Sequence, residues 1–344
     1  MAYTTIDKPT DYFNTVLYTG NATARTITGV GFQPDWVWGK IRSEAQDHVL
    51  VDSVRGATKQ LYSSDTSAEQ TESQGLTGFA SDGFTLGTHA YFNKNTATYV
   101  AWNWLAGGTA SSNGDGSITS SVSANTTAGF SIVTYTGTGS AATVGHGLGA
   151  VPKMFWTKRI DSSESWGVYS DTQGAGKFLR LESTNAVDTS STLWNNTTPT
   201  SSVFSIGTGG IANTSSGTYV AYCFAEKQGY SKFGSYTGNG NANGAFVYTG
   251  FRPAFVLLKV SSTTNNWNMF DDKRPGFNEI DQRLFPNLSS AEQDGTAGVD
   301  FLSNGFKFRN TNDNYNASGA TYIYMAFAEN PFVTAGTKAA GTAV

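Results

Sequence analysis

One pattern occurs three times in this chain, and it constrains the fold more than any other feature. Each copy opens with Tyr-Thr-Gly and closes with a strand-like segment that begins Thr-Tyr. The two tyrosines of a copy lie 81, 84 and 86 positions apart, as Tyr18 and Tyr99, Tyr135 and Tyr219, and Tyr236 and Tyr322. Repetition at a fixed period indicates one structural unit used several times. The chain has 344 residues, which is enough for three domains of about 100 residues each.

Other residue types recur inside the copies at matching positions. They are Pro34, Pro152 and Pro253; Lys40, Lys158 and Lys259; Asp52, Asp171 and Asp271 or Asp272; Phe84, Phe204 and Phe306; and Asn93, Asn213 and Asn316. We interpret them as parts of the fold. The proline starts a strand, the glycine of Tyr-Thr-Gly supplies a turn with positive φ, and the opening tyrosine is a core-edge aromatic with a satisfied hydroxyl. The asparagine caps a turn, and the lysine and aspartate pair across strands at the surface.

The secondary structure is expected to be almost entirely β. Segments are short, aromatic or β-branched, and bounded by Gly, Asn, Ser and Thr. In residues 98–104 the side chains alternate so that one face can be buried. Six to eight strands per copy predict three tandem antiparallel β-sandwich or jelly-roll-like domains. Short helical turns are expected near 67–70 and 290–293, which share the sequence Ser-Ala-Glu-Gln that copy two lacks.

Composition shifts predict the domain boundaries. We expect an N-terminal arm at 1–13, repeat 1 at 14–106, a Gly/Ser/Thr-rich linker at 107–129, repeat 2 at 130–229, repeat 3 at 230–332 and a tail at 333–344. Ile118 and Val122 allow a short stretch of the linker to pair as a strand. Because the boundary near residue 229 is tight, copies two and three are expected to pack as a pair, with copy one more loosely attached.

Composition also excludes several classes of protein. Aromatic residues make up 13% of the chain, which argues against disorder although charged residues are only 14%. The net charge is −4 and no basic block is present, which argues against nucleic-acid binding. The sequence contains no run of 18 apolar residues, so no membrane span is predicted. The N-terminus has no signal-peptide pattern. The single cysteine, Cys223, is expected to be a small buried side chain.

Catalysis and metal binding have little support. A glycosidase needs two carboxylates flanking the sugar, but no acidic residue recurs beside the repeated aspartate in all three copies. The position of His48 holds Trp166 and Trp267 in the other copies, so His48 is interpreted as part of a wall. No His/Cys cluster has metal-binding spacing, and residues 113–116 are interpreted as a linker turn rather than a calcium loop. We therefore expect no catalytic residues, no metal and no cofactor.

Binding is the better-supported activity. Tryptophan, tyrosine and asparagine are what a lectin uses to stack and hydrogen-bond sugars, although the same residues fill sandwich cores. Trp194 is the strongest candidate for a ligand or receptor contact, because turn-forming residues follow it. Phe92 and Tyr315, just before the closing segments, are weaker candidates.

Several segments carry a resemblance to a known group of proteins. They are Thr-Gly-Val-Gly-Phe-Gln-Pro-Asp-Trp-Val-Trp at 28–38, Asp-Ser-Val-Arg-Gly-Ala-Thr-Lys at 52–59, Phe-Gly-Ser-Tyr-Thr-Gly-Asn-Gly at 233–240 and Ala-Phe-Ala-Glu-Asn-Pro-Phe at 326–332. Together they resemble structural proteins of tailed bacteriophages, especially marine ones, over nearly the whole chain. The resemblance implies a tail-fibre or other virion protein and carries no catalytic residues. The Asp-Ser-Val-Arg-Gly motif is complete only in copy one.

These observations lead to one functional hypothesis and three alternatives. We expect a non-enzymatic virion protein on the particle exterior, as a tail fibre or receptor-binding component, assembled in the host cytoplasm. The alternatives are a capsid decoration or head-fibre protein, a lectin-like glycan-binding module, and a polysaccharide-degrading enzyme. Expected partners are other virion proteins and a host receptor, which can be a glycan. We expect a homotrimer; alternatively, the three units adopt pseudo-threefold symmetry within one chain.

Overall fold

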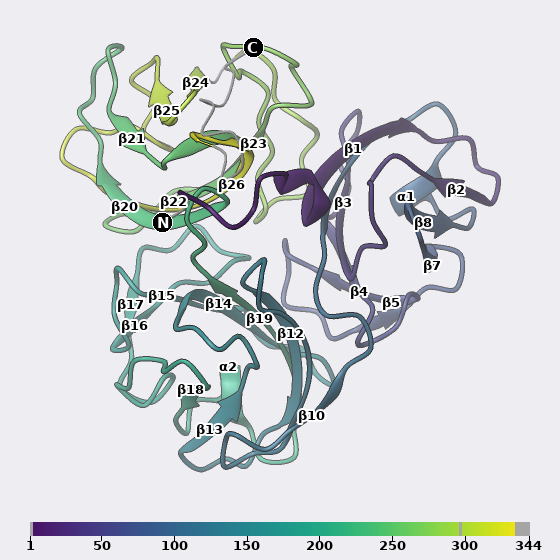
Figure 1. Ribbon diagram of the computed structural model, residues 1–344, viewed down its shortest axis with the longest axis vertical. Helices are drawn as coiled ribbons and strands as arrows, with labels where there is room; N and C mark the ends of the chain where they lie inside the picture. Colours follow the sequence, from purple (N-terminus) through teal and green to yellow (C-terminus); the bar gives the residue numbers. More distant parts are fainter. Residues whose placement is uncertain (1–2, 296–297, 334–344) are drawn as a thin grey trace.

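Three antiparallel sheets with the same strand order form the framework of this protein (Figure 1). A computed structural model describes residues 3–295 and 298–333. In each sheet the opening strand pairs with the closing strand, which pairs with the strand at the repeated proline. The orders are β1 (Phe13–Thr19), β9 (Thr98–Trp104), β3 (Trp36–Ile41), β4 (Val49–Asp52); β12 (Phe130–Thr136), β19 (Thr218–Ala225), β14 (Pro152–Arg159), β15 (Gly167–Ser170); and β20 (Ser231–Thr237), β26 (Thr321–Pro331), β22 (Phe251–Val260), β23 (Trp267–Asp271). We call these parts unit 1 (residues 13–106), unit 2 (107–229) and unit 3 (230–332). The predicted all-β, antiparallel fold class is confirmed.

A smaller sheet lies against each principal sheet. These sheets are β2 (Arg25–Ile27), β8 (Gly83–Leu86), β7 (Leu76–Ala80); β13 (Ala142–Gly145), β18 (Val203–Ile206); and β21 (Phe246–Tyr248), β25 (Gly305–Phe308), β24 (Val299–Leu302). The remaining elements are β5 (Lys59–Tyr62), β6 (Gln70–Thr71), β10 (Ser111–Asn113), β11 (Ser120–Asn125), β16 (Lys177–Phe178), β17 (Asp188–Thr189), η1 (Pro9–Asp11), α1 (Ala90–Asn93) and α2 (Gly210–Asn213). No helix among the described residues is both long enough and apolar enough to span a membrane.

Both faces of the central strands of each principal sheet are buried, which explains why the strand at each proline is continuously apolar. In β3, Val37 packs into the core between the two sheets of unit 1, while Trp36 and Trp38 point to the other face. Since successive side chains of a strand point to opposite faces, the same alternation holds in β14 and β22. One face of every principal sheet thus serves its own unit, and the other serves a core that all three units share.

The shared core holds the three units around a common centre, as the three lobes of Figure 1 show. The ring centroid of Trp36 in unit 1 lies 4.5 Å from that of Tyr222 in unit 2. Phe13 stacks on Phe327 of unit 3 at 5.2 Å, and Phe327 lies 6.3 Å from Phe224 of unit 2. The expectation that copy one is loosely attached is therefore wrong, because its aromatic residues fill the same core as the other two copies.

The predicted linker contributes two strands to the sheet of unit 2. Strands β10 and β11 within 107–129 form a hairpin that pairs with β12 and extends the sheet of unit 2. Of the two suggested strand residues, Val122 lies in β11 and Ile118 makes an isolated bridge to Val144. The described part of the arm, residues 3–12, packs on the shared core through Ile6 and crosses to Tyr230 through Tyr12. Residues 334–344 of the predicted tail lie outside the described residues.

The recurrent asparagine and tyrosine have the structural roles predicted for them. Asn93 accepts a hydrogen bond from the Asn21 amide at 3.0 Å and donates to the carbonyls of Thr23 and Gly87. Asn213 and Asn316 make the corresponding bonds in units 2 and 3. The opening tyrosines donate to the backbone one residue before each of these asparagines and stack on the closing tyrosines at 4.9–5.2 Å.

The glycine of each Tyr-Thr-Gly is required for a different reason from the one predicted. Gly20, Gly137 and Gly238 are not among the residues with positive φ. A Cβ at these positions would meet a backbone carbonyl oxygen at 2.0–2.4 Å. Close approach of the closing loop, not turn conformation, therefore excludes a side chain.

Candidate functional site

The three residues predicted to contact a ligand are all buried. Trp194 is 1% exposed, packs edge-on against Phe155 at 4.7 Å and donates its indole N–H to the Lys177 carbonyl. Phe92 lies in α1 against Gly39, and Tyr315 stacks on Phe308 at 5.2 Å. Both are fully buried. The expectation of exposed loop aromatics is wrong because each of these segments folds back and fills the space between the two sheets of its unit.

The most highly organised polar groups lie where the units meet. We call these contacts the 1/2 seam, the 2/3 seam and the 3/1 seam after the units they join. Each seam contains two backbone hydrogen bonds between the units. They join a segment of one unit to the turn of the next unit that follows its lysine-bearing strand. The N–H to carbonyl pairs are Glu164 to Thr66 and Glu69 to Ile160 in the 1/2 seam, Asn265 to Thr184 and Val187 to Ser261 in the 2/3 seam, and Gln46 to Ser289 and Glu292 to Arg42 in the 3/1 seam.

The two Ser-Ala-Glu-Gln segments lie in these seams. Ser67 to Glu69 and Ser290 to Glu292 have no regular secondary structure, so the predicted helical turns are wrong. Backbone bonding places Asn185 to Val187 of unit 2 in the same role. Copy two therefore has a counterpart that its sequence conceals, because only the backbone geometry is shared.

The recurrent lysines are buried tethers between units rather than surface charges. The Lys158 ammonium of unit 2 donates to the carbonyl of Thr66 in unit 1 at 3.1 Å. Lys40 reaches Ser289 and Lys259 reaches Thr184 in the same way, at 3.4 and 3.3 Å. The expected surface pairing with the repeated aspartate is wrong, since all three lysines are fully buried and bond to backbone carbonyls.

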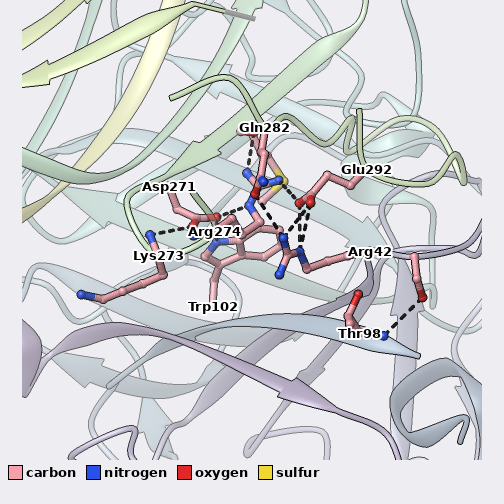
Figure 2. Close-up of polar contacts among 10 residues, drawn as sticks. Arg42, Thr98, Trp102, Asp271, Lys273, Arg274, Gln282 and Glu292 are labelled. Atoms are coloured by element: carbon pink, nitrogen blue, oxygen red, sulfur yellow. Dashed lines mark hydrogen bonds and ion pairs between the residues drawn. The ribbon is translucent and has the colours of Figure 1, made fainter. Parts of the chain in front are cut away.

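A cluster of charged side chains closes the 3/1 seam, and Figure 2 shows Arg274 between Asp271 and Glu292. The Arg274 Nε donates to Asp271 at 2.6 Å and its Nη1 donates to Glu292 at 2.8 Å. From unit 1, the Trp102 indole donates to the same Asp271 oxygen at 3.0 Å, and Arg42 donates to Glu292 at 2.8 Å. Buried carboxylates normally need such charge-assisted bonds.

The balance of burial and charge keeps Glu292 and Arg274 ionised. Burial acts to raise the pKa of Glu292, but the hydrogen bonds and charges of Arg42 and Arg274 outweigh it and leave the pKa lowered. Burial acts to lower the pKa of Arg274, and Asp271 and Glu292 reverse that effect so that it is raised. The cluster is therefore a fixed set of opposite charges that specifies how unit 3 docks on unit 1.

The 1/2 seam contains a similar cluster, in which Ile160 stands at the position of Arg42. Arg55 donates to Asp52 at 2.6 Å and to Glu69 at 3.0 Å. The Tyr222 hydroxyl of unit 2 donates to Asp52 at 2.8 Å, in place of the Trp102 indole. The Asp-Ser-Val-Arg-Gly motif of copy one is thus half of an inter-unit contact.

The 2/3 seam lacks this cluster because all of its members differ together. In units 1 and 3 the repeated aspartate is paired across two strands, as Asp52 with Trp36 and Asp271 with Phe255. The equivalent pair in unit 2 is Ser170 with Met154. The predicted match of Asp171 to these aspartates is therefore wrong. Gln173 replaces the arginine, and Val187 replaces the glutamate. Met325 takes the strand position of Tyr222 and Trp102. A buried ion cluster can be exchanged for neutral groups without loss of stability only when every partner changes.

His48 and its equivalents line the seams, as the wall interpretation predicted. The Trp166 indole donates to the Tyr62 carbonyl across the 1/2 seam, and the Trp267 indole donates to the Arg180 carbonyl across the 2/3 seam. In unit 1 the His48 Nδ1 accepts the Trp38 indole N–H at 3.0 Å. Burial, with Lys40 and Arg274 nearby, lowers the pKa of His48 well below its usual value, so the ring is neutral.

The seam lysines predict an unusual pH dependence of stability. Burial lowers the pKa of Lys259 to about 7 and those of Lys40 and Lys158 to about 8. At these three sites the unfolded chain binds more protons than the folded protein from about pH 7 to 10, so the contribution of the lysines to the free energy of unfolding rises with pH over that range. Above about pH 9 Cys223 and tyrosines such as Tyr135 and Tyr236 act in the opposite direction, because burial raises their pKa values.

Urea unfolding of the wild type and of Lys259→Met, followed by tryptophan fluorescence from pH 6.5 to 9.5, measures this effect. As pH rises, the free energy of unfolding of the wild type should increase relative to that of Lys259→Met. Lys177→Met, at a solvent-exposed lysine, is the control and should show no such trend. A pH-independent difference for Lys259→Met would contradict the assignment.

A polar groove runs along the 1/2 seam. A cavity of about 530 Å³ lies between Arg55 and Glu69 of unit 1 and strands β10, β11, β12 and β19 of unit 2. A second cavity of about 420 Å³ shares Ser121 and Thr134 with it. These two residues are paired across β11 and β12, and their hydroxyls have no hydrogen-bond partner in the described part of the chain. The groove exists because the β10–β11 hairpin widens only the sheet of unit 2.

Within the described residues, no group of three or more His, Cys, Asp and Glu side chains is arranged to hold a metal ion. The family described as "Domain of unknown function (DUF7483)" matches residues 8–331. The chain belongs to the DUF7483 family. The DUF7483 match spans all three units and all three seams, so the family's domain is the whole three-unit body rather than one repeat. No curated protein is similar to the chain.

Sequence reasoning missed the seams, although two signals pointed to them. The Asp-x-x-Arg spacing of Asp52 and Arg55 recurs in Asp271 and Arg274, and each is followed by the shared Ser-Ala-Glu-Gln. In the 1/2 seam and in the 3/1 seam, the two motifs form parts of the same contact. The sequence alone does not show this, because the contact is completed by residues of the neighbouring unit.

Proposed function

We propose that this protein is a non-enzymatic structural protein on the exterior of a bacteriophage particle, as a tail fibre or another component of host adsorption. The sequence resemblance motivates the proposal. The observation that carries it is the closure of three similar units around one core, fixed by buried charges and lysine tethers. Such a body is a rigid platform that presents three different sets of loops outward.

The position on the particle is tested directly. Mass spectrometry of purified particles should detect the chain, and cryo-electron microscopy with an antibody to it should place it at the tail tip. Label on the capsid would move the assignment to a decoration or head-fibre protein. Absence from purified particles would contradict the proposal altogether.

The oligomeric state is a separate proposal. The sequence led us to expect a homotrimer, with single-chain pseudo-threefold symmetry as the alternative. The filled core shared by the three units supports the alternative, because one chain already makes the contacts that three single-unit subunits would make. Sedimentation equilibrium should therefore find a species of 36.6 kDa. A species of about three times that mass would restore the homotrimer.

A further inference from the structure

Strand β21 of unit 3 carries two exposed aromatic side chains on one face. Phe246 is 46% exposed and Tyr248 is 55% exposed, while Val247 between them is buried. Alternate residues of a strand lie about 6.6 Å apart on the same face. Single exposed aromatic residues are ordinary, but two on one face of a short strand form a small exposed aromatic surface.

The other two units show that the fold does not need these aromatic residues. The buried residue of β21 has an equivalent in each of the other units, because each is paired with the recurrent phenylalanine. The pairs are Val247 with Phe306 in unit 3, Ile27 with Phe84 in unit 1 and Val144 with Phe204 in unit 2. The positions that flank this buried residue are therefore Thr26 and Thr28 in unit 1, and Thr143 and Gly145 in unit 2. A Cβ at Gly305 of the neighbouring strand would meet the Phe246 ring, whereas the nearest atoms to a Cβ at the equivalent Gly83 belong to the backbone of Ile27 and Thr28. The aromatic pair is thus an addition to unit 3.

A small polar pocket adjoins the aromatic pair. It has a volume of about 240 Å³, and Tyr248 forms one wall. Tyr3 forms another wall and donates its hydroxyl to the Gly250 carbonyl at 2.5 Å. This approach requires the absence of a side chain at Gly250, where a Cβ would lie 2.6 Å from the Tyr3 hydroxyl. Burial and the adjacent Tyr248 raise the pKa of Tyr3 to about 12, so its hydroxyl stays protonated.

The polar side chains of the pocket offer donors and acceptors without net charge. Lys232 and Glu226 form an ion pair at 2.6 Å, and both remain partly exposed. The Gln228 side chain is exposed and has no hydrogen-bond partner in the described part of the chain. An amide supplies both donor and acceptor groups, as does a paired ammonium and carboxylate. This combination matches a ligand whose polar groups are hydroxyls, each of which donates and accepts.

We propose that Phe246, Tyr248 and the adjoining pocket bind a neutral hexose residue of a polysaccharide or oligosaccharide. The C–H face of a pyranose ring is weakly positive and apolar, so it fits on the negative face of an aromatic ring. The ring's hydroxyls then reach Gln228 and the Lys232–Glu226 pair. The balanced charge of the pocket favours a neutral sugar over an acidic one. This assignment does not depend on where the protein sits on a particle.

The test uses the full chain on an array of immobilised neutral hexose oligosaccharides made of glucose, galactose or mannose. We expect binding to at least one of them. Phe246→Thr and Tyr248→Thr, which introduce the residue that unit 1 has at each position, should each weaken that binding at least tenfold. Tyr248→Phe keeps the ring and should stay within about threefold of the wild type.

Two controls separate a site from a general loss of structure. Phe277→Ser removes a 75% exposed aromatic of unit 3 that does not line this pocket, and it should leave binding unchanged. Both threonine variants should unfold at the wild-type temperature. The proposal is overturned if no oligosaccharide binds, or if the threonine variants bind as the wild type does. The protein can also be tested for binding to host cell surfaces treated with periodate, which destroys sugars, or with protease. Binding that survives periodate and is abolished by protease would equally overturn the proposal, in favour of a protein partner.

Discussion

Replacing Arg274 with leucine is expected to lower the free energy of unfolding by about 3–5 kcal/mol. The change leaves the carboxylates of Asp271 and Glu292 in the 3/1 seam without their shared partner, and Asp271 is fully buried. The Trp102 indole and Arg42 cannot compensate, because each reaches only one of the two carboxylates. Urea unfolding at pH 7, monitored by circular dichroism, measures the loss.

The 2/3 seam supplies the matched controls for Arg274. Gln173→Leu changes the equivalent position, where the side chain makes a weak bond of 3.4 Å to Ser261, and should cost less than about 1 kcal/mol. A fourfold variant, with Asp271→Ser, Arg274→Gln, Glu292→Val and Arg42→Ser, places the residues of the 2/3 seam at the four charged positions of the 3/1 seam and keeps Trp102. It should recover more than half of the stability lost in Arg274→Leu. A fourfold variant as unstable as the single one would show that unpaired charge is not the cause.

Replacing Trp36 with alanine should lower the stability of the whole chain, not of unit 1 alone. Removal of a fully buried tryptophan costs about 3–5 kcal/mol. The Trp36 ring lies 4.5 Å from Trp104 of its own unit and 4.5 Å from Tyr222 of unit 2. Because the lost contacts belong to the shared core, units 1 and 2 are destabilised together.

Differential scanning calorimetry tests this coupling. Wild type and Trp36→Ala should each unfold in one transition whose calorimetric and van't Hoff enthalpies agree, with the variant's transition at lower temperature. Hydrogen exchange should show reduced protection in β12 and β19 as well as in β3 and β9. Two or three separate transitions in the wild type would contradict a single shared core, and so would exchange changes confined to unit 1.

Local features of the fold were predictable because they depend on residues close together in the sequence or repeated in it. The caps made by Asn93, Asn213 and Asn316 are an example, since turn formers of one type at one spacing have one common use. The opening tyrosines with bonded hydroxyls are another. The pattern also marked His48 as part of a wall, because Trp166 and Trp267 stand at the same position.

The candidate site was predicted less well for a physical reason. A tryptophan in a Ser/Thr/Asn-rich segment reads as an exposed loop residue, but Trp194 is buried because its loop folds back over Phe155. In the same way, Lys158 stands near the end of a strand, where a lysine normally reaches solvent, yet its ammonium is buried by unit 1. Burial depends on which distant surface covers a residue, and local composition does not record that.

By itself, the sequence determined that this protein consists of three similar β units with apolar strands after Pro34, Pro152 and Pro253. It did not determine what covers those strands. A continuously apolar strand can be the centre of a sandwich or one side of a seam between units, because both environments bury both faces. Only the tertiary structure decided between them. It closed the three units around one core, made Asp52, Arg55 and their unit 3 counterparts into inter-unit clusters, and left Phe246 and Tyr248 exposed beside a polar pocket.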